Sequence, residues 1–90
     1  MPYRIVLSRT ATKELARLPS KMHDKVITQL CKLEVDPRGQ GCEKLTGFDA
    51  YKRRVGDLRI VFEINDSSRE VRVVMVEDRK QVYKKLRRTN

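Results

Sequence analysis

The segment of residues 51–62 constrains the fold of this chain more than any other part of the sequence. Two runs of β-prone residues flank the dipeptide Gly56-Asp57, and a two-residue loop with glycine first is typical of a type II′ turn between antiparallel strands. Such a turn fixes the register and places Arg54 opposite Arg59. Because alternate residues share a face, Lys52, Arg54 and Arg59 are predicted to lie on one face of the hairpin.

The opposed pair Arg54 and Arg59 indicates a ligand outside the fold, because like charges facing each other across strands destabilise a sheet. The 90 residues include 21 Lys and Arg against 12 Asp and Glu, a formal net charge of +9. Such a surplus favours nucleic acid, an anionic membrane or an acidic protein as partner. Membrane is the weakest of the three, since no apolar run approaches the roughly 20 residues of a spanning helix. We therefore interpret the hairpin as a surface for a polyanion.

Length and residue types limit the other possibilities. Residues 1–90 are expected to form one domain with a small core. The N-terminal segment becomes polar too soon for a signal peptide, so we expect a cytoplasmic protein. Cys31 and Cys42 have neither CxxC spacing nor a neighbouring histidine, which predicts free thiols and no metal site. His23 is the single histidine, which excludes a catalytic His pair, and we interpret it as a helix-surface residue.

Hydrophobic spacing predicts a strand and two helices in the first part of the chain. Residues 3–7 alternate in a β-prone pattern, and Ser8 is the expected N-cap of a helix that ends at Pro19. Ser20 is the expected cap of a second helix, which carries apolar residues at helical spacing up to position 33. Two helices joined at positions 19–20 are expected to pack as an antiparallel pair.

The second part of the chain predicts three strands and a helix. Residues 50–56 and 57–65 form the hairpin, and residues 70–76 are apolar on both faces, which favours a central strand. Residues 79–88 return to helical spacing. The element order β-α-α-β-β-β-α predicts an α+β fold, with an antiparallel sheet and the helices packed on one face.

The residue types present exclude most catalytic machinery. A Ser-His-Asp site is ruled out, no Gly-rich phosphate loop is present, and the adjacent Glu77 and Asp78 would point to opposite faces of a strand. Cations and phenols remain, and they suit RNA cleavage in which the ribose 2′-OH attacks the adjacent phosphorus while Arg and Lys stabilise the charge. A tyrosine crowded by cations has a lowered pKa and can also stack on a base. For Tyr83, packing within a helical stripe is the competing interpretation.

Four segments in order along the chain resemble the RelE/ParE toxin superfamily. Residues 51–62, YKRRVGDLRIVF, are similar to its Y-[KR]-x-[KR]-x-G-x-[YL]-R-[IV]-x-[YF] segment. Residues 76–83, VEDRKQVY, resemble the V-x-x-R-x-x-[VI]-Y ending of the RelE branch. The L-x-G at 45–47 and the Leu-Pro at 18–19 fit the same pattern. The resemblance thus extends over nearly the whole chain.

The resemblance implies a RelE-like microbial RNase fold and the toxin of a type II toxin–antitoxin system. Such a toxin is an mRNA interferase that enters the ribosomal A site and cuts the codon by 2′-OH attack, with no metal or cofactor, and so inhibits translation. Carried over to this chain, Lys52 and Arg54 would hold the phosphate and the transition state. Arg59 would stabilise the developing charge. Arg79 would do likewise or assist the leaving group, and Tyr83 would stack on or activate the attacking nucleotide.

The resemblance also implies an acidic antitoxin as partner, and any role on operator DNA would run through that antitoxin. One departure concerns Arg54, where the family often has lysine. Arginine does not readily give up its proton, so Lys52 or Tyr83 would have to serve as base. A second point concerns Arg79, which needs a break in the strand near residues 77–78 to turn toward the hairpin cations.

Two other functions remain open at this stage. One is a ParE-like inhibitor of DNA gyrase on the same fold, with no chemistry of its own. The other is a non-catalytic RNA- or DNA-binding module. The combination of Arg79 and Tyr83 argues against both, because the ParE branch usually lacks it and a pure binder has no need of the tyrosine.

Overall fold

The structure is a computed structural model that describes residues 2–88, without the side chains at positions 79, 83, 87 and 88. Along the chain it contains β1 (Arg4–Leu7), α1 (Arg9–Ala16), α2 (Ser20–Val35), β2 (Cys42–Lys44), β3 (Tyr51–Val55), β4 (Leu58–Asn65), β5 (Glu70–Asp78) and α3 (Arg79–Arg88). This α+β arrangement confirms the predicted class and adds one strand, β2, to the predicted order. No helix in the described part of the chain is long and apolar enough to span a membrane.

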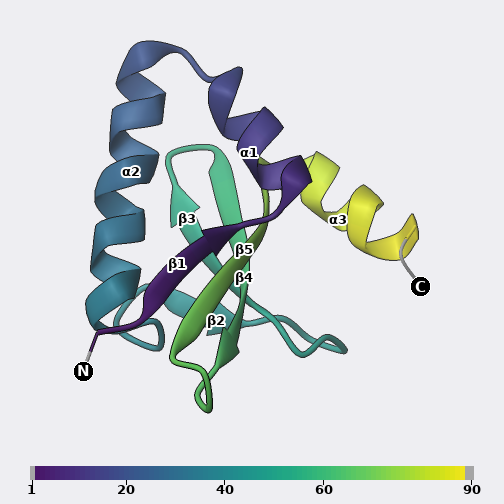
Figure 1. Cartoon of the computed structure of the whole chain (residues 1–90). Helices are drawn as coiled ribbons and strands as arrows, with labels where there is room; N and C mark the ends of the chain where they lie inside the picture. Colours follow the sequence, from purple (N-terminus) through teal and green to yellow (C-terminus); the bar gives the residue numbers. More distant parts are fainter. Residues whose placement is uncertain (1, 89–90) are drawn as a thin grey trace.

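The strands form one five-stranded sheet in the order β1-β5-β4-β3-β2 (Figure 1). β5 lies between β1 and β4, as predicted for a strand that is apolar on both faces. The prediction of a wholly antiparallel sheet is wrong at one edge, because β1 pairs in parallel with β5. More than sixty residues separate these two strands, so no hairpin turn sets their relative direction.

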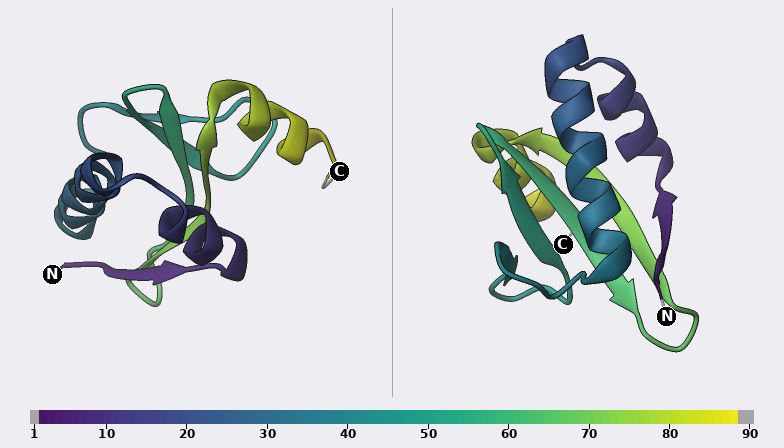
Figure 2. Two further views of the ribbon diagram at one scale, coloured as in Figure 1. Left: turned by 90° about the horizontal axis from the view of Figure 1, so that it is seen from above. Right: turned by 90° about the vertical axis from the view of Figure 1, so that its left-hand side faces the viewer.

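The helices cover both faces of the sheet, not one face as predicted. α1 and α2 pack on one face, over a core that includes Leu15, Val26, Leu33, Ile60, Phe62, Val71 and Val73. α3 packs on the opposite face, where Val82 and Leu86 meet Leu45, Ala50, Val61 and Met75 (Figure 2). The apolar stripe of α3 is buried there because β4 and β5 carry apolar residues on both faces of the sheet.

A β-bulge in β5 changes which residues face α3. Val61 pairs with Met75 while the next residue of β4, Phe62, pairs with Val73, so Val74 is the extra residue. Before the bulge Val73 faces the α1–α2 core; after it Met75 faces α3. The alternation of side chains between the two faces of β5 therefore shifts at Val74. The sequence had indicated a break near residues 77–78 as the way to turn Arg79 toward the hairpin cations.

Local turn and cap signals were mostly reliable. Gly56 has a φ of +59°, as the first central residue of a type II′ turn requires. Asp57 has a negative φ, because Arg69 is the one non-glycine residue with positive φ in the described part of the chain. These signs confirm the type II′ turn at Gly56-Asp57. Ser8 caps α1 by accepting the N–H of Ala11 at 3.0 Å. The predicted cap at Ser20 is wrong, since Ser20 lies inside α2 and the extended Pro19 occupies the N-cap position.

Candidate functional site

The hairpin of β3 and β4 brings three cations to one face of the sheet. Arg54 pairs directly with Arg59, and Lys52 pairs with Val61, as the turn predicted. Val61 belongs to the core under α3, so Lys52, Arg54 and Arg59 lie on the face that carries α3. The geometric prediction is confirmed; the catalytic roles of these residues remain predictions.

Two clefts adjoin the opposed arginines. The smaller has a volume of about 120 Å³ and is lined by Gly41, Glu43, Lys52, Arg54 and Arg59. The larger has about 360 Å³ and is lined by Arg54, Asp57, Arg59, Asp78 and Lys80. Because both clefts include Arg54 and Arg59, this pair lies between them. Three cations therefore converge on a space that could hold a phosphate and its neighbours.

Both arginines are held by backbone carbonyls of their own hairpin. Arg54 Nε donates to the carbonyl of Gly56 at 3.0 Å, and Arg59 Nη1 donates to that of Leu58 at 3.2 Å. Within the described part of the chain neither guanidinium has a carboxylate in salt-bridge range. Each therefore keeps most of its five N–H donors for an external anion. The backbone bonds fix the direction of the side chains, and the carboxylates that line the same clefts, Glu43, Asp57 and Asp78, form no salt bridge with them among the described residues.

The neighbouring Arg53 lies on the opposite face of the sheet, which carries α1 and α2, and has a structural role. Its Nε donates to Gln29 Oε1 at 2.6 Å, and its Nη1 donates to the carbonyl of Gln40 at 2.9 Å. These bonds tie β3 to α2 and to the loop before β2. Strand alternation thus separates a structural arginine from the two arginines beside the clefts.

The two remaining predicted site residues lie in α3, and their side chains are outside the described residues. The backbone of Arg79 begins α3 and that of Tyr83 lies one turn later. Asp78 precedes the helix and accepts the N–H of Gln81 at 3.0 Å, which is N-capping geometry. Since Asp78 and Lys80 also line the larger cleft, α3 starts beside the opposed arginines.

Sequence reasoning missed a buried carboxylate behind this site. Glu14 of α1 is the one buried charged residue in the described part of the chain. It accepts the N–H of Val76 at 2.7 Å and binds the ammonium of Lys85 on α3. β1 ends at Leu7, so β5 has an open edge beyond that point, and Glu14 takes the place of a strand there. A signal was present, because Glu14 falls within the apolar stripe of α1 between Ala11 and Leu15.

Glu77 belongs to this network and does not line the clefts. Lys85 lies 3.6 Å from its carboxylate. Burial, together with the neighbouring Glu14, raises the pKa of Glu77 above its ordinary value. The hydrogen bond to Glu14 raises the pKa of Lys85. The network therefore joins α1, β5 and α3 and holds the helix of Tyr83 against the sheet.

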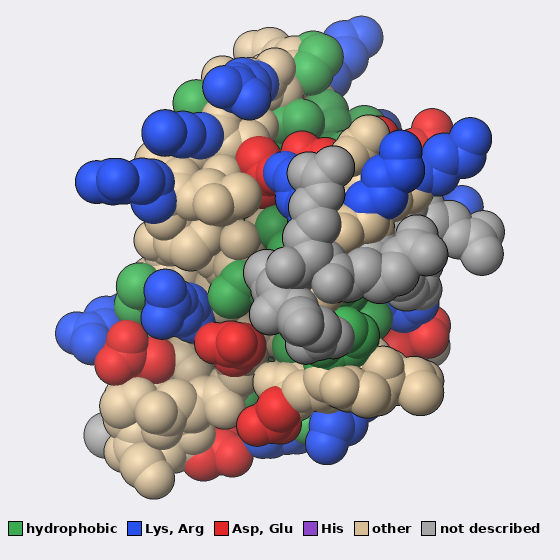
Figure 3. Space-filling model, turned by 90° about the vertical axis from the view of Figure 1, so that its right-hand side faces the viewer, with side chains coloured by type: hydrophobic (Ala, Val, Ile, Leu, Met, Phe, Trp, Pro, Cys, Tyr) green, Lys and Arg blue, Asp and Glu red, His purple; other side chains and the backbone are tan. Residues whose placement is uncertain are grey.

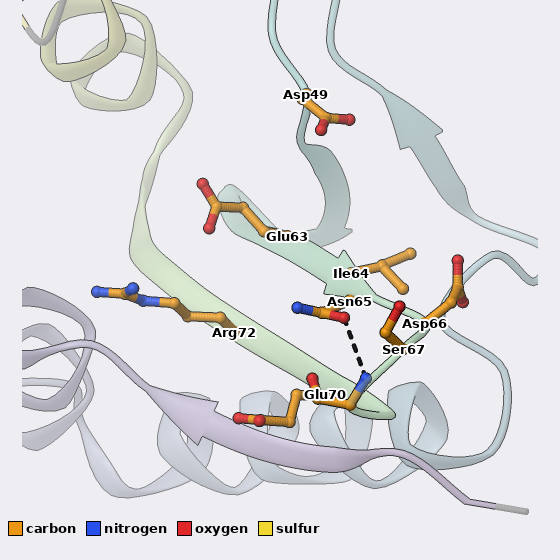
Figure 4. A pocket seen from close by; sticks show the side chains of 9 residues that line it. Asp49, Glu63, Ile64, Asn65, Asp66, Ser67, Glu70 and Arg72 are labelled. Atoms are coloured by element: carbon orange, nitrogen blue, oxygen red, sulfur yellow. Dashed lines mark hydrogen bonds between the residues drawn. The ribbon is translucent and has the colours of Figure 1, made fainter.

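The largest cavity among those described lies elsewhere and has the wrong charge for a phosphate. It has about 620 Å³ and is lined by Asp49, Glu63, Asp66 and Glu70 with Arg72 as its one cation (Figure 4). Figure 3 shows that Lys and Arg side chains are spread over the side viewed from α3, with acidic side chains between them. The clefts at the opposed arginines are therefore the better candidate for an anionic ligand.

No group of His, Cys, Asp and Glu in residues 2–88 could hold a metal ion.

Comparison with protein families decides the membership of the chain. The family model described as ParE toxin of the type II toxin-antitoxin system parDE matches residues 5–83. The chain belongs to the RelE/ParE superfamily of type II toxins. A search of curated protein sequences gave no match.

Solved structures of RelE toxins share the fold. The RelBE2 complex of Mycobacterium tuberculosis matches with a TM-score of 0.79 and 23% identity over 88% of this chain and 100% of that chain. A mutant of the Escherichia coli toxin RelE in the free state matches with a TM-score of 0.80 and 24% identity over 93% of both chains. The intact E. coli RelBE complex matches with a TM-score of 0.76 and 26% identity, over 84% of this chain and 95% of that chain. The family model thus carries the ParE name while these structures are RelE toxins.

Proposed function

We propose that this toxin is a metal-independent endoribonuclease that cuts mRNA codons in the ribosomal A site. The observation that supports the proposal is the opposed pair Arg54 and Arg59, which lies between two clefts and beside Lys52. Like charges placed in register across two strands destabilise the sheet, so an anionic ligand at this position would offset that cost. A phosphodiester bond that gains negative charge during cleavage would make use of them.

In the proposed reaction the ribose 2′-OH gives up its proton and attacks the adjacent phosphorus, the bond from phosphorus to the 5′ oxygen breaks, and that oxygen takes up a proton. Lys52 and Arg54 hold the phosphate, and Arg59 stabilises the charge on its non-bridging oxygens. Arg79 assists with the charge on the phosphate or on the leaving oxygen, and Tyr83 stacks on or activates the attacking nucleotide. The products are a 2′,3′-cyclic phosphate and a 5′-OH. The nucleophile belongs to the substrate, so orientation and charge are the contribution of the protein.

The proposed neutralising partner is an acidic antitoxin. Several of the similar structures are complexes of a RelE toxin with its antitoxin, and a charge of +9 on this chain favours an acidic protein. An antitoxin that covers the clefts at Arg54 and Arg59 would exclude the mRNA by charge and by shape.

Primer extension on a translated mRNA tests the proposal. Wild-type toxin is expected to give cuts in codon register, and Arg59→Gln is expected to slow them by roughly 10²–10³-fold, as removal of one preorganised charge donor does. Lys25→Gln is the matched control, because it removes one positive charge from the exposed surface of α2, away from the clefts. Equal cleavage by Arg59→Gln and Lys25→Gln would remove the support that the arginine pair gives.

A ParE-like inhibitor of DNA gyrase is the second candidate, because the family model that matches is that of ParE. Purified gyrase with supercoiled DNA distinguishes the two. If the wild-type toxin leaves translated mRNA intact and causes gyrase to accumulate broken DNA, the endoribonuclease proposal is wrong. Rapid mRNA cleavage with unaffected gyrase excludes the second candidate.

A further inference from the structure

A third cleft extends the groove beyond the cations. It has a volume of about 170 Å³ and is lined by Glu43, Lys44, Leu45, Thr46, Lys52, Phe48 and Leu86. Glu43 and Lys52 also line the small cleft at Arg54 and Arg59. The two clefts are therefore adjacent, and Lys52 lies at their junction.

We propose that this third cleft binds one base of the mRNA, next to the phosphate held by Lys52 and Arg54, and so contributes to codon preference. The inference rests on the proposed endoribonuclease function and adds a specificity subsite to it. The decisive residue is Phe48, the one aromatic residue among the described residues that line the three clefts. An aromatic ring beside a basic groove is the usual platform for a base of single-stranded RNA.

The lining of the cleft matches the chemistry of a nucleobase. Phe48 and Leu86 give it apolar walls for the faces of a flat ring. Glu43 supplies hydrogen-bond acceptors, and the hydroxyl of Thr46 can donate or accept a hydrogen bond at the edge of the ring. A phosphate would gain nothing from the apolar walls, and a purely apolar ligand would leave the polar groups without a partner.

The loop that carries Phe48 is closed and anchored. The N–H of Leu45 donates to the carbonyl of Ala50 at 2.9 Å, and both residues are buried in the core under α3. Gly47 has a φ of +82°, which lets the chain reverse between these two anchors. Phe48 itself is half-buried and packs against the same core. A ring fixed in this way is ordered before RNA arrives, which lowers the entropy cost of binding.

Two variants of Phe48 separate stacking from packing. Phe48→Tyr keeps the ring, whereas Phe48→Leu keeps an apolar side chain against the core and removes the ring. The first measurement is primer extension on translated mRNAs that present all codons. We expect Phe48→Tyr to keep the wild-type codon profile. Phe48→Leu should lose the preference for particular bases at one codon position and should cleave roughly tenfold more slowly than wild type. Urea unfolding of both variants shows whether Phe48→Leu is folded under the assay conditions.

The second measurement does not depend on cleavage. Fluorescence anisotropy compares binding of a short single-stranded RNA with binding of the same RNA carrying an abasic site at one position. Wild type and Phe48→Tyr are expected to bind the complete RNA roughly tenfold more tightly, and folded Phe48→Leu is expected to bind both equally. If every protein binds the two RNAs equally, or if folded Phe48→Leu keeps both the wild-type preference and the wild-type codon profile, the subsite is refuted while the endonuclease stands. If wild type does not cut, the proposed function fails and the anisotropy comparison alone decides the base subsite.

Discussion

Replacement of Glu14 offers the sharpest test of how α1, β5 and α3 are held together. Its Oε1 accepts the buried N–H of Val76, and its Oε2 binds the ammonium of Lys85. Glu14→Ala leaves the N–H without an acceptor, which costs about 1–3 kcal/mol. It also removes the ion pair with Lys85, whose side chain is 33% exposed, so solvent limits that loss to about 1 kcal/mol or less. The free energy of unfolding should fall by about 1–4 kcal/mol in total.

Glu14→Gln separates the two contributions. The amide oxygen can still accept the N–H of Val76, while the negative charge opposite Lys85 is lost. We therefore expect a loss of about 1 kcal/mol or less, below that of Glu14→Ala by the cost of the unpaired N–H. Lys13→Ala is the control, because it changes an exposed residue of the same helix and should stay within about 0.5 kcal/mol of wild type.

Urea unfolding followed by far-ultraviolet circular dichroism measures these differences, since the chain has no tryptophan. A loss of about 1–4 kcal/mol is a sizeable part of the stability of a small domain and shifts the midpoint without changing the m-value. The reasoning is refuted if Glu14→Ala unfolds at the same urea concentration as Lys13→Ala. If Glu14→Gln loses as much as Glu14→Ala, the charge and not the bond to Val76 carries the effect.

Four further outcomes follow from contacts elsewhere in the fold. Arg38, chiefly by hydrogen bonding, lowers the pKa of Asp66 from 3.8 to about 2. The stability that this shift gives is complete above about pH 4 and is lost as the pH falls toward 2. In Asp66→Asn the urea midpoint should therefore depend less on pH over that range. The pKa of Glu77 is raised, so its ionised form costs stability at neutral pH, and Glu77→Gln should stabilise the fold at pH 7 and not at pH 4. Gly56→Ala should cost about 1–2 kcal/mol of unfolding free energy, because a side chain disfavours φ +59°. Arg53→Met should lose about 1–2 kcal/mol through its hydrogen bonds. Under the proposed function it should keep the wild-type rate of mRNA cleavage, which a primer-extension assay checks.

Short-range signals in the sequence were sufficient for the hairpin and for one helix cap. The register of Arg54 with Arg59 follows from a two-residue turn and from strand alternation, and both depend on neighbours within a few positions. The cap at Ser8 is equally local. The three-residue β2 gave no signal, because an exposed strand of this length has too few residues to show an alternation.

Contacts between distant segments could not be predicted in the same way. Glu14 meets Val76 and Lys85 across 62 and 71 positions of the chain, and no pattern within one helix identifies those partners. The bulge at Val74 is similar, since it depends on how β5 matches β4. For the candidate site, the shared face of the hairpin cations was predictable, whereas the adjoining cleft of Phe48 required the packing of a loop against α3. The roles of Arg79 and Tyr83 remain predictions from the resemblance.

The hairpin can carry opposed arginines because its stability comes from its other face. Ile60 and Phe62 are fully buried there against α1 and α2, and each buried side chain of this size contributes about 1.5–3 kcal/mol. The repulsion between Arg54 and Arg59 costs roughly 0.2–1 kcal/mol, which this burial exceeds several-fold. Strand alternation places the stabilising burial on one face of the hairpin and the charge repulsion on the other. The charged face can therefore be adapted to a ligand without loss of the fold. For the same reason a charge change at Arg54 or Arg59 should reduce the proposed cleavage of RNA far more than it changes the free energy of unfolding, which makes these positions informative about function.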